Sequence, residues 1–521
     1  MNIKIGLTGG SGNMGVEALK QFLELEFIDK INLLLRNKKR NHSFAKKLKK
    51  QYPNKINVIY GNIENHDDCL KLVEGTSYIF HLAALIPPMA DHNFEQTDLT
   101  NNVGVKNLLR AIEKQKNQPK LIHISTVGIY GNRDYHHPWG RVGDPLLPSP
   151  YDVYSITKLK GERAVLESNV KSWVILRQTG VLHKNLLKDN ISDGLLFHTP
   201  YNVPIEWVTA EDSGVLLRNI LVQDYKQTID EKFWKKVYNI GGGELNRVTG
   251  YETFQEGFGV MGVSVEEFMK PNWNATRNFH CMWFLDSHIL NDYFNFQSQS
   301  LHSFWEDILN SHKYFKLAKI FSPKLLSKLV LGPLLKDENA PYYWVKNELT
   351  PRVIAAFGSV EQYNSLPETW DNFPVLAKGR TPDNEIIDYN ELKDISHAEK
   401  YLLNHGYDEN KKDEDIDIDD LREAALFRGG KLISTSMVKG DLYTPLEWES
   451  HSGRRFILSP YAVIKAGHWD AIQELPEPWN YDELAKTNPF YAQIWYDTHS
   501  ENEENRYYFD GDVAKIKQKE I

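Results

Sequence analysis

Two residues in the first half of the chain have the types and the spacing of a proton-transfer pair. Tyr154 and Lys158 stand four residues apart in a stretch that follows the proline-rich segment 145–150 and is predicted to begin a helix. Both side chains then project from one helix face. A lysine ammonium near a phenol lowers the pKa of the phenol, which can then donate and accept a proton near neutral pH. This spacing alone is common, so the chemistry depends on the elements around it.

A glycine-rich turn between a predicted strand and a predicted helix provides a candidate cofactor site. The strand covers residues 3–7, the turn 8–15 and the helix 16–25. In a dinucleotide-binding βαβ unit, successive glycines allow a tight turn, the approach of a pyrophosphate, and close packing of helix on strand. Gly9, Gly12 and Gly15 have these positions. The N–H groups and the dipole of the helix N-terminus favour the negative pyrophosphate.

Further apolar segments predict strands that alternate with helices. Strands separated by helices at this spacing predict a parallel, doubly wound α/β sheet. Ligands of such sheets bind beyond the carboxyl ends of the strands, and the motifs follow those ends. The predicted strands are 31–35, 58–60, 78–80 and 121–124, and the predicted helices between them are 67–73 and 102–113.

The composition is that of a globular protein with more than one domain. The chain has 521 residues, of which 41% are hydrophobic, 25% charged and 12% aromatic. Its net charge of −9 gives no reason to expect a nucleic acid partner. The two cysteines, Cys69 and Cys281, exclude a disulfide framework and a cysteine-based zinc site, as expected in a reducing compartment. With no apolar run of transmembrane length and no leader expected, we predict a cytoplasmic protein without a membrane partner.

Taken together, the motifs resemble those of extended short-chain dehydrogenases/reductases of the NAD-dependent epimerase/dehydratase family. The resemblance covers roughly the first half of the chain and runs in the family's order. It implies a Rossmann-type sheet with a small substrate-binding cap, here over residues 194–207. The matching stretches are 8–15, 61–63, 81–84, 101–109, 124–131, 154–158, 175–181 and 238–243.

The resemblance also implies what the site residues do. Tyr154 is the general acid/base, Lys158 lowers its pKa and holds the nicotinamide ribose, and Thr126 hydrogen-bonds the reacting oxygen of the substrate. Other residues line the cofactor along its length, and no metal is implied. The implied cofactor-binding residues are Gly9, Gly12, Asn13, Met14, Gly15, Arg36, Asn62, Ile63, Ala83, Ala84, Asn101, Tyr154, Lys158 and Gln178.

Two positions depart from the family pattern. The family usually has aspartate where Asn62 stands, which is a mild change because an amide can still bond adenine. It usually has proline where Gln178 stands, in a segment near the nicotinamide. Neither departure removes a catalytic group.

The residue that ends the second predicted strand bears on the choice of cofactor. In this fold an acid at that position accepts the ribose 2′-hydroxyl of NAD, whereas an arginine accommodates the 2′-phosphate of NADP. Arg36 stands there, followed by Lys38, Lys39 and Arg40 and no nearby acid. We therefore predict NADP, with NAD as the alternative.

Three histidines near the predicted site invite a metal interpretation that we do not favour. His123 alternates with apolar residues on a strand, which is typical of a satisfied, buried or half-buried histidine. His136 and His137 lie in the loop before Tyr154, where the family contacts its substrate. A substrate role is the better hypothesis for that loop.

The second half of the chain carries no family pattern. We divide the chain into a dinucleotide-binding and substrate domain (1–310), a helical and irregular extension ending in an acidic linker (311–420), and a small C-terminal α+β module (421–521). The module resembles a zinc-ribbon-like unit around Trp448 and Trp469. Glu449, Ser450 and Asp470 stand where such units have cysteines, so it cannot form a Cys₄ site.

Three functions remain open at this point. The first is an NADP-dependent oxidoreductase that moves hydride between the nicotinamide and a substrate carbonyl or alcohol carbon. The second is an NAD-dependent epimerase of a sugar or nucleotide sugar, and the third is a non-catalytic NADP-binding sensor or scaffold. A small molecule is the expected partner of the site, and a homodimer is inferred only by analogy.

Overall fold

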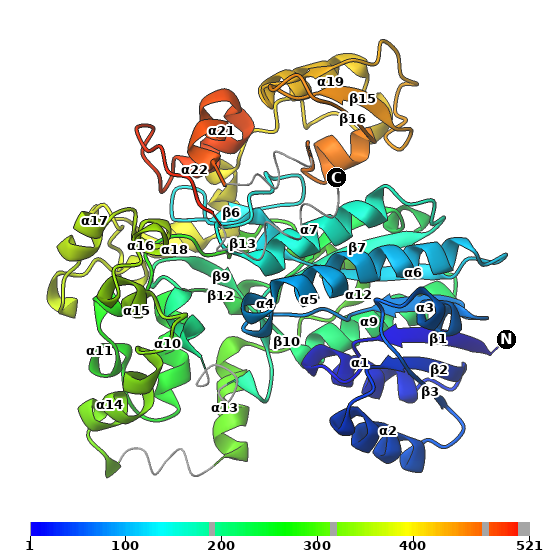
Figure 1. The fold of residues 1–521 in the computed structure, drawn as a ribbon, viewed down its shortest axis with the longest axis horizontal. Helices are drawn as coiled ribbons and strands as arrows, with labels where there is room; N and C mark the ends of the chain where they lie inside the picture. The colour runs from blue at the N-terminus through cyan, green and yellow to red at the C-terminus, as the bar shows by residue number, and fades with distance from the viewer. Residues whose placement is uncertain (1, 187–192, 313–319, 471–478, 509–521) are drawn as a thin grey trace.

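The computed structural model describes residues 2–186, 193–312, 320–470 and 479–508 (Figure 1). Its centre is a seven-stranded sheet in the order β11-β7-β5-β4-β1-β2-β3, and every neighbouring pair is parallel. The predicted doubly wound α/β fold is confirmed. The strands are β1 (Ile3–Thr8), β2 (Ile28–Leu35), β3 (Ile56–Tyr60), β4 (Tyr78–His81), β5 (Lys120–Thr126), β7 (Trp173–Gln178) and β11 (Lys236–Ile240).

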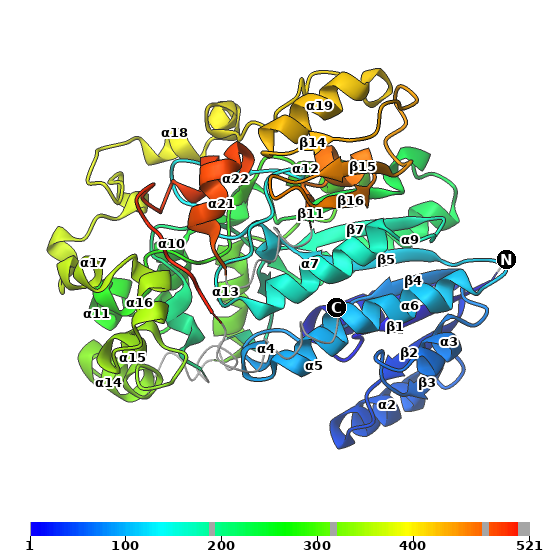
Figure 2. The same cartoon turned by 45° about the horizontal axis from the view of Figure 1, so that its top comes forward.

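Helices cover both faces of this sheet, as Figure 2 shows from a second side. Because successive strand residues point to opposite faces, Ile79 and Phe80 belong to two different apolar cores. The core around Ile79 includes α3 (His66–Val73), α6 (Gly104–Glu113) and α7 (Val153–Leu166). The core around Phe80 includes α1 (Asn13–Leu23), α2 (Lys39–Gln51), α9 (Ala210–Tyr225) and α12 (Ser287–Phe294).

The strand order reverses next to β1. From β1 the chain adds β2 and then β3 on one side, and it then crosses to β4 on the other side of β1. Connections that leave neighbouring strands toward opposite faces open a crevice beyond the strand ends. The glycine turn after β1 and residues 82–84 after β4 both lie at this crevice.

A mostly helical layer lies beyond the carboxyl ends of the strands (Figure 1). Pro323 is the first residue of α14 (Pro323–Leu334), where a missing N–H costs nothing. Within the described ranges, no helix has both the length and the apolar character needed to cross a bilayer. The helices of this layer are α10 (Gly250–Gly259), α11 (Val265–Phe268), α13 (Leu301–Ser311), α14 (Pro323–Leu334), α15 (Pro341–Lys346), α16 (Thr350–Phe357) and α17 (Val360–Ser365).

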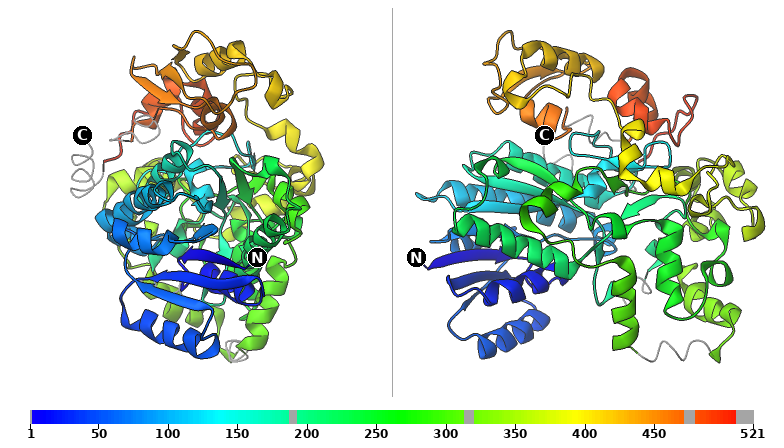
Figure 3. Two further views of the ribbon diagram at one scale, coloured as in Figure 1. Left: turned by 90° about the vertical axis from the view of Figure 1, so that its right-hand side faces the viewer. Right: turned by 180° about the vertical axis from the view of Figure 1, so that it is seen from behind.

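The C-terminal part of the chain lies against the sheet face that carries α7 (Figure 3). It contains α19 (Ile418–Phe427) and a three-stranded antiparallel sheet of β14 (Lys431–Leu432), β15 (Leu446–Glu449) and β16 (Arg455–Leu458). The predicted boundary after residue 420 falls inside α19. Ile416, in the predicted acidic linker, is buried because it packs into the same core as α7. The domain division and the zinc-ribbon resemblance stay predictions.

The Glu162 carboxylate on α7 joins this C-terminal part to the sheet. It accepts hydrogen bonds from the Ser125 hydroxyl and from the Arg177 guanidinium, each at 2.6 Å. Nε2 of His468 lies 3.0 Å from it, and Arg177 also donates to the carbonyl of Ala466 at 2.7 Å. Burial alone would raise the pKa of Glu162, but Arg177 and His468 hold it well below its usual range. All three charged or polar partners are fully buried, so this junction excludes water.

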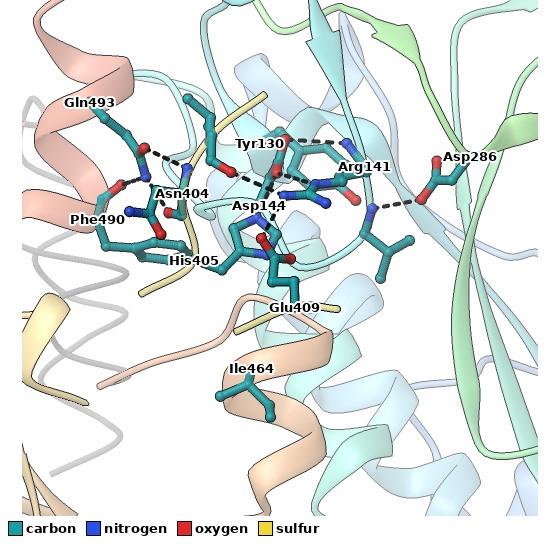
Figure 4. Close-up of polar contacts among 12 residues, drawn as sticks. Tyr130, Arg141, Asp144, Asp286, Asn404, His405, Glu409, Ile464, Phe490 and Gln493 are labelled. Atoms are coloured by element: carbon teal, nitrogen blue, oxygen red, sulfur yellow. Dashed lines mark hydrogen bonds and ion pairs between the residues drawn. The ribbon is translucent and has the colours of Figure 1, made fainter. Parts of the chain in front are cut away.

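A second polar cluster ties the loop after β5 to residues 403–409 (Figure 4). The His405 ring lies between two carboxylates, 2.9 Å from Asp144 and 2.7 Å from Glu409. Arg133 pairs with Asp144 at 3.0 Å and Arg141 with Glu409 at 2.8 Å. Burial would raise the pKa of Asp144, yet Arg133 and His405 lower it to about 2. The second half of the chain is therefore fastened to the sheet domain by paired charges as well as by apolar contacts.

Replacing His468 should show how much stability this junction contributes. His468→Ala removes a donor from a buried carboxylate, and we expect the free energy of unfolding to fall by about 1–3 kcal/mol. His468→Gln, whose amide can still donate, should recover part of the loss. Urea unfolding of the full chain at pH 7 measures both.

His302→Ala is the matched control, because His302 also faces a carboxylate, Glu256 at 3.2 Å, but is 70% exposed. It should leave the urea midpoint nearly unchanged. If His468→Ala changed the urea midpoint as little as His302→Ala does, the contact between His468 and Glu162 would make no measurable contribution to stability.

Candidate active site

The glycine turn has the geometry that a bound pyrophosphate needs. Gly9 has a φ of +71°, and a Cβ there would meet the Ala83 nitrogen at 2.7 Å. A Cβ at Gly15 would meet the Gly9 oxygen at 2.1 Å, whereas one at Gly12 would meet only that oxygen, at 3.3 Å. The first and third glycines are thus required by the fold, and the second leaves space above the backbone.

The N-terminus of α1 faces that space. Gly12 is its N-cap residue and makes no side-chain capping bond, and the first turn contains no acidic residue. Asn13 and Met14 provide the first backbone N–H groups of the helix and are partly exposed. A phosphate group placed here would accept hydrogen bonds from these N–H groups.

Thr8 fixes the ends of β1 and β4 relative to each other. Its hydroxyl oxygen accepts hydrogen bonds from the backbone nitrogens of Leu82 at 3.2 Å and Ala83 at 3.1 Å. It also lies 2.7 Å from Nδ1 of His81. These bonds hold Ala83 and the partly exposed Ala84 at the edge of the crevice, where they were predicted.

Tyr154 and Thr126 lie together at the carboxyl end of β5. Asp152 caps α7 by accepting a hydrogen bond from the Ser155 nitrogen at 2.9 Å, which starts the helix at Val153. Burial raises the pKa of the Tyr154 phenol to about 12, and the charge of Asp152 adds to this shift. A hydrogen bond with Thr126 opposes it. The phenol is therefore protonated at neutral pH.

Lys158 lies one turn further along α7, as its spacing predicted, but it does not make the phenol acidic here. Its Nζ donates a hydrogen bond of 2.6 Å to the carbonyl of Ile124 on β5. Burial lowers the pKa of Lys158 to about 8, against the opposing effect of Glu162. The pKa of Tyr154 is thus raised where the sequence predicted that it would be lowered, because burial outweighs the hydrogen bond with Thr126 and Asp152 adds to the effect of burial.

Asn101 and Gln178 have different environments. Asn101 is buried and joins two parts of the site, since its side chain bonds the backbone of Leu85 at 2.8 and 3.0 Å and the Thr157 hydroxyl at 3.1 Å. It therefore braces α7 against the loop after β4. Gln178 ends β7 and lies 3.5 Å from the Ser213 hydroxyl.

The predicted adenosine end lies at the ends of β2 and β3. Arg36 follows β2 directly, and its side chain is exposed. Asn62 donates its backbone N–H to the Asp68 carboxylate at 3.1 Å, and Ile63 is buried. Sequence reasoning missed Asp68, whose only signal was its place in the first turn of α3, six residues beyond Asn62.

Two buried histidines lie beneath Lys158. The rings of His81 and His123 are 5.2 Å apart on the adjacent strands β4 and β5. Burial and the Lys158 charge lower the pKa of His81 to about 3 and that of His123 well below its usual value. His123 was predicted to be a satisfied histidine, yet among the described residues neither of its ring nitrogens has a hydrogen-bond partner. Both rings are neutral, because the nearby ammonium and the lack of water disfavour a second charge.

Charged side chains also gather around Asp152, two residues before Tyr154. Asp152 pairs with His280 at 3.1 Å. Asp91, on the short helix α4 (Met89–His92) that contacts α7, has its pKa raised to about 8 by burial and by Asp152 and Asp193. Arg352 from α16 lies close enough to oppose that shift. A protonated Asp91 and Arg352 can both donate hydrogen bonds to substrate oxygens.

The histidines of the loop before Tyr154 are paired with carboxylates. His136 lies 3.0 Å from Asp134, and His137 lies 2.7 Å from Asp497. Ligand atoms of Asp134, His136 and Asp497 are within 4.8 Å of one another. The ion pairs account for this grouping, and the loop contacts the C-terminal part of the chain.

Comparison with known proteins finds similarity to one family in the first third of the chain. The sequence model of the NAD dependent epimerase/dehydratase family matches residues 5–181. Sterol-4-alpha-carboxylate 3-dehydrogenase, decarboxylating, from Mus musculus is 25% identical over 167 residues, which are 32% of this chain and 41% of that protein. UDP-glucose 4-epimerase from Rickettsia bellii is 30% identical over 125 residues, 23% of this chain and 35% of that protein. The match thus spans about two fifths or less of these relatives' own length.

Among solved structures, the UDP-Glc/GlcNAc 4-epimerase of Campylobacter jejuni is 19% identical and has a TM-score of 0.47. The match covers 60% of this chain and 99% of the epimerase chain. Residues 5–181, which contain the glycine turn, Thr126, Tyr154 and Lys158, are thus the part of the chain that matches the model of the NAD dependent epimerase/dehydratase family.

Proposed function

We propose that this protein is an NADP-dependent oxidoreductase that transfers hydride between the nicotinamide and a substrate carbonyl or alcohol carbon. The observation that carries the proposal is the placement of Tyr154, Thr126 and Lys158 at one strand end, beside a glycine turn open to a pyrophosphate. The family match supports a nicotinamide dinucleotide as the cofactor. Arg36, exposed at the end of β2, supports the phosphorylated form.

The protonated phenol of Tyr154 favours the reducing direction, because reduction of a carbonyl needs a proton donor. A nicotinamide cofactor would supply a hydride for the carbonyl carbon of the substrate, and the carbonyl oxygen would then need a proton. That oxygen takes the proton of Tyr154. The phenol still carries this proton at neutral pH, because its pKa is about 12. The Thr126 hydroxyl can then stabilise the phenolate that remains, since it already hydrogen-bonds the phenol oxygen.

Epimerisation is the second candidate, because UDP-glucose 4-epimerases are among the relatives. The same residues serve there, but hydride returns to the substrate within one cycle. A protein that recycles its nucleotide has no need to release it. The two functions therefore differ in whether the nucleotide leaves.

Removing the Tyr154 hydroxyl tests the acid/base role. Tyr154→Phe should lower kcat/KM by about 10²–10⁴-fold on any carbonyl or sugar compound that the wild type converts. The affinity for the cofactor, followed by the fluorescence of the reduced nicotinamide, should hardly change. Tyr443→Phe, an exposed phenol bonded to the Lys235 carbonyl, is the control. Near-normal turnover by Tyr154→Phe would contradict the acid/base role of Tyr154.

The nucleotide retained by freshly purified protein separates the two candidates. Denaturation followed by chromatography should release little nucleotide if the protein is a reductase that exchanges its cofactor. Close to one NAD per chain would favour the epimerase and would count against the role of Arg36.

Replacing Arg36 tests the choice of cofactor. Arg36→Ala should weaken NADPH binding by about tenfold or more, because a charge-assisted hydrogen bond to phosphate is lost, and leave NADH binding unchanged. Titration of both nucleotides measures this. Lys49→Ala, in the last turn of α2, is the control for general loss of positive charge. Equal loss for NADPH and NADH would contradict recognition of the 2′-phosphate.

A further inference from the structure

The helix α14 buries one face against the rest of the helical layer. Ser327, Leu331 and Leu334 are buried, at a spacing that places them on one side of the helix. Leu331 and Leu334 belong to an apolar cluster with Phe268 of α11. The Ser327 hydroxyl donates a hydrogen bond of 2.7 Å to the carbonyl of Phe268. These contacts hold α14 against α11.

The opposite face is apolar as well, although it is exposed. Phe321 is 51% exposed, Leu325 44% and Leu329 62%, and they follow one another at intervals of four residues. Ile320, just before the helix, is 76% exposed. A helix that covers a globular domain normally has a polar outer face, since exposed apolar side chains gain nothing from folding. Packing among the described residues does not account for the stripe.

The charged residues of α14 all have one sign. Lys324 and Lys328 stand next to Leu325 and Leu329 on the exposed side, and α14 contains no acidic residue. Over the ranges that the structure covers, neither lysine forms an ion pair. This is a local excess of positive charge on a chain whose net charge is −9. We refer to Ile320, Phe321, Lys324, Leu325, Lys328 and Leu329 as the α14 patch.

We propose that the α14 patch docks on the surface of a membrane that contains anionic phospholipids. A helix with an apolar stripe and flanking lysines can lie in the interface, where the stripe enters the acyl boundary and the ammonium groups meet lipid phosphates. Figures 1 and 2 place α14 at the margin of the molecule, where a flat surface can reach it. This contact is peripheral, so it needs no spanning helix, and it revises the prediction of no membrane partner.

A second copy of the chain fits the α14 patch less well. A symmetric dimer buries the same patch of both copies, so Lys324 and Lys328 of both copies would lie in one interface. The apolar gain would then be opposed by repulsion between unpaired ammonium groups. Anionic headgroups satisfy both features of the patch.

Vesicle co-sedimentation of the full chain tests the proposal. Binding should be stronger to vesicles of phosphatidylcholine mixed with phosphatidylserine than to phosphatidylcholine alone, and it should weaken as salt is added. The double variant Leu325→Glu and Leu329→Glu should bind about tenfold or more weakly, because two apolar contacts are lost. The double variant Lys324→Gln and Lys328→Gln should lose the preference for phosphatidylserine.

Leu426→Glu is the matched control, because Leu426 on α19 is 74% exposed but has no neighbouring apolar stripe. It should bind vesicles like the wild type. All the replaced side chains are exposed, and unchanged thermal unfolding would show that the variants fold. Absence of binding at low salt, or equal binding by the Leu325→Glu and Leu329→Glu variant, would overturn the proposal. So would a wild-type dimer that this variant dissociates, since a second copy would then be the occupant.

Discussion

The buried carboxylate of Glu162 is the interaction on which the site and the second half of the chain both depend. A carboxylate removed from water is costly unless its oxygens are fully bonded and its charge is balanced. Ser125 on β5, Arg177 on β7 and His468 near the C-terminus provide those partners, each within 3.0 Å. Removing any one of them would leave the other groups buried with an incomplete set of bonds.

This constraint also positions the candidate catalytic residues. Lys158 and Glu162 are one turn apart on α7, and they bond the neighbouring residues Ile124 and Ser125 of β5. Two bonds between the same helix and strand fix their register, and Thr126 is the next residue of that strand. Asn101 adds a third anchor through Thr157. The contact between Tyr154 and Thr126 therefore depends on the bonds that Lys158, Glu162 and Asn101 make.

The sequence predicted the parts that are encoded locally. The glycine turn, the parallel strands and the pair Tyr154 and Lys158 follow from short patterns whose spacing has a fixed geometric meaning. The bond from His468 to Glu162 could not be predicted, because it joins residues 306 positions apart and neither has a motif. The same holds for the contact between His405 and Asp144, which are 261 positions apart. The high pKa of Tyr154 was missed because burial is a property of the whole fold.

Burial shifts Tyr154 and Lys158 in opposite directions, and both shifts favour the uncharged form. The pKa of Tyr154 rises to about 12 and that of Lys158 falls to about 8. Glu162 is the charge that keeps the pKa of Lys158 from falling further, and Arg177 and His468 keep Glu162 ionised. His468 therefore acts on the ammonium through two steps, although it belongs to a part of the chain outside the family match. The C-terminal part thus acts on the charge state of a residue of the candidate site.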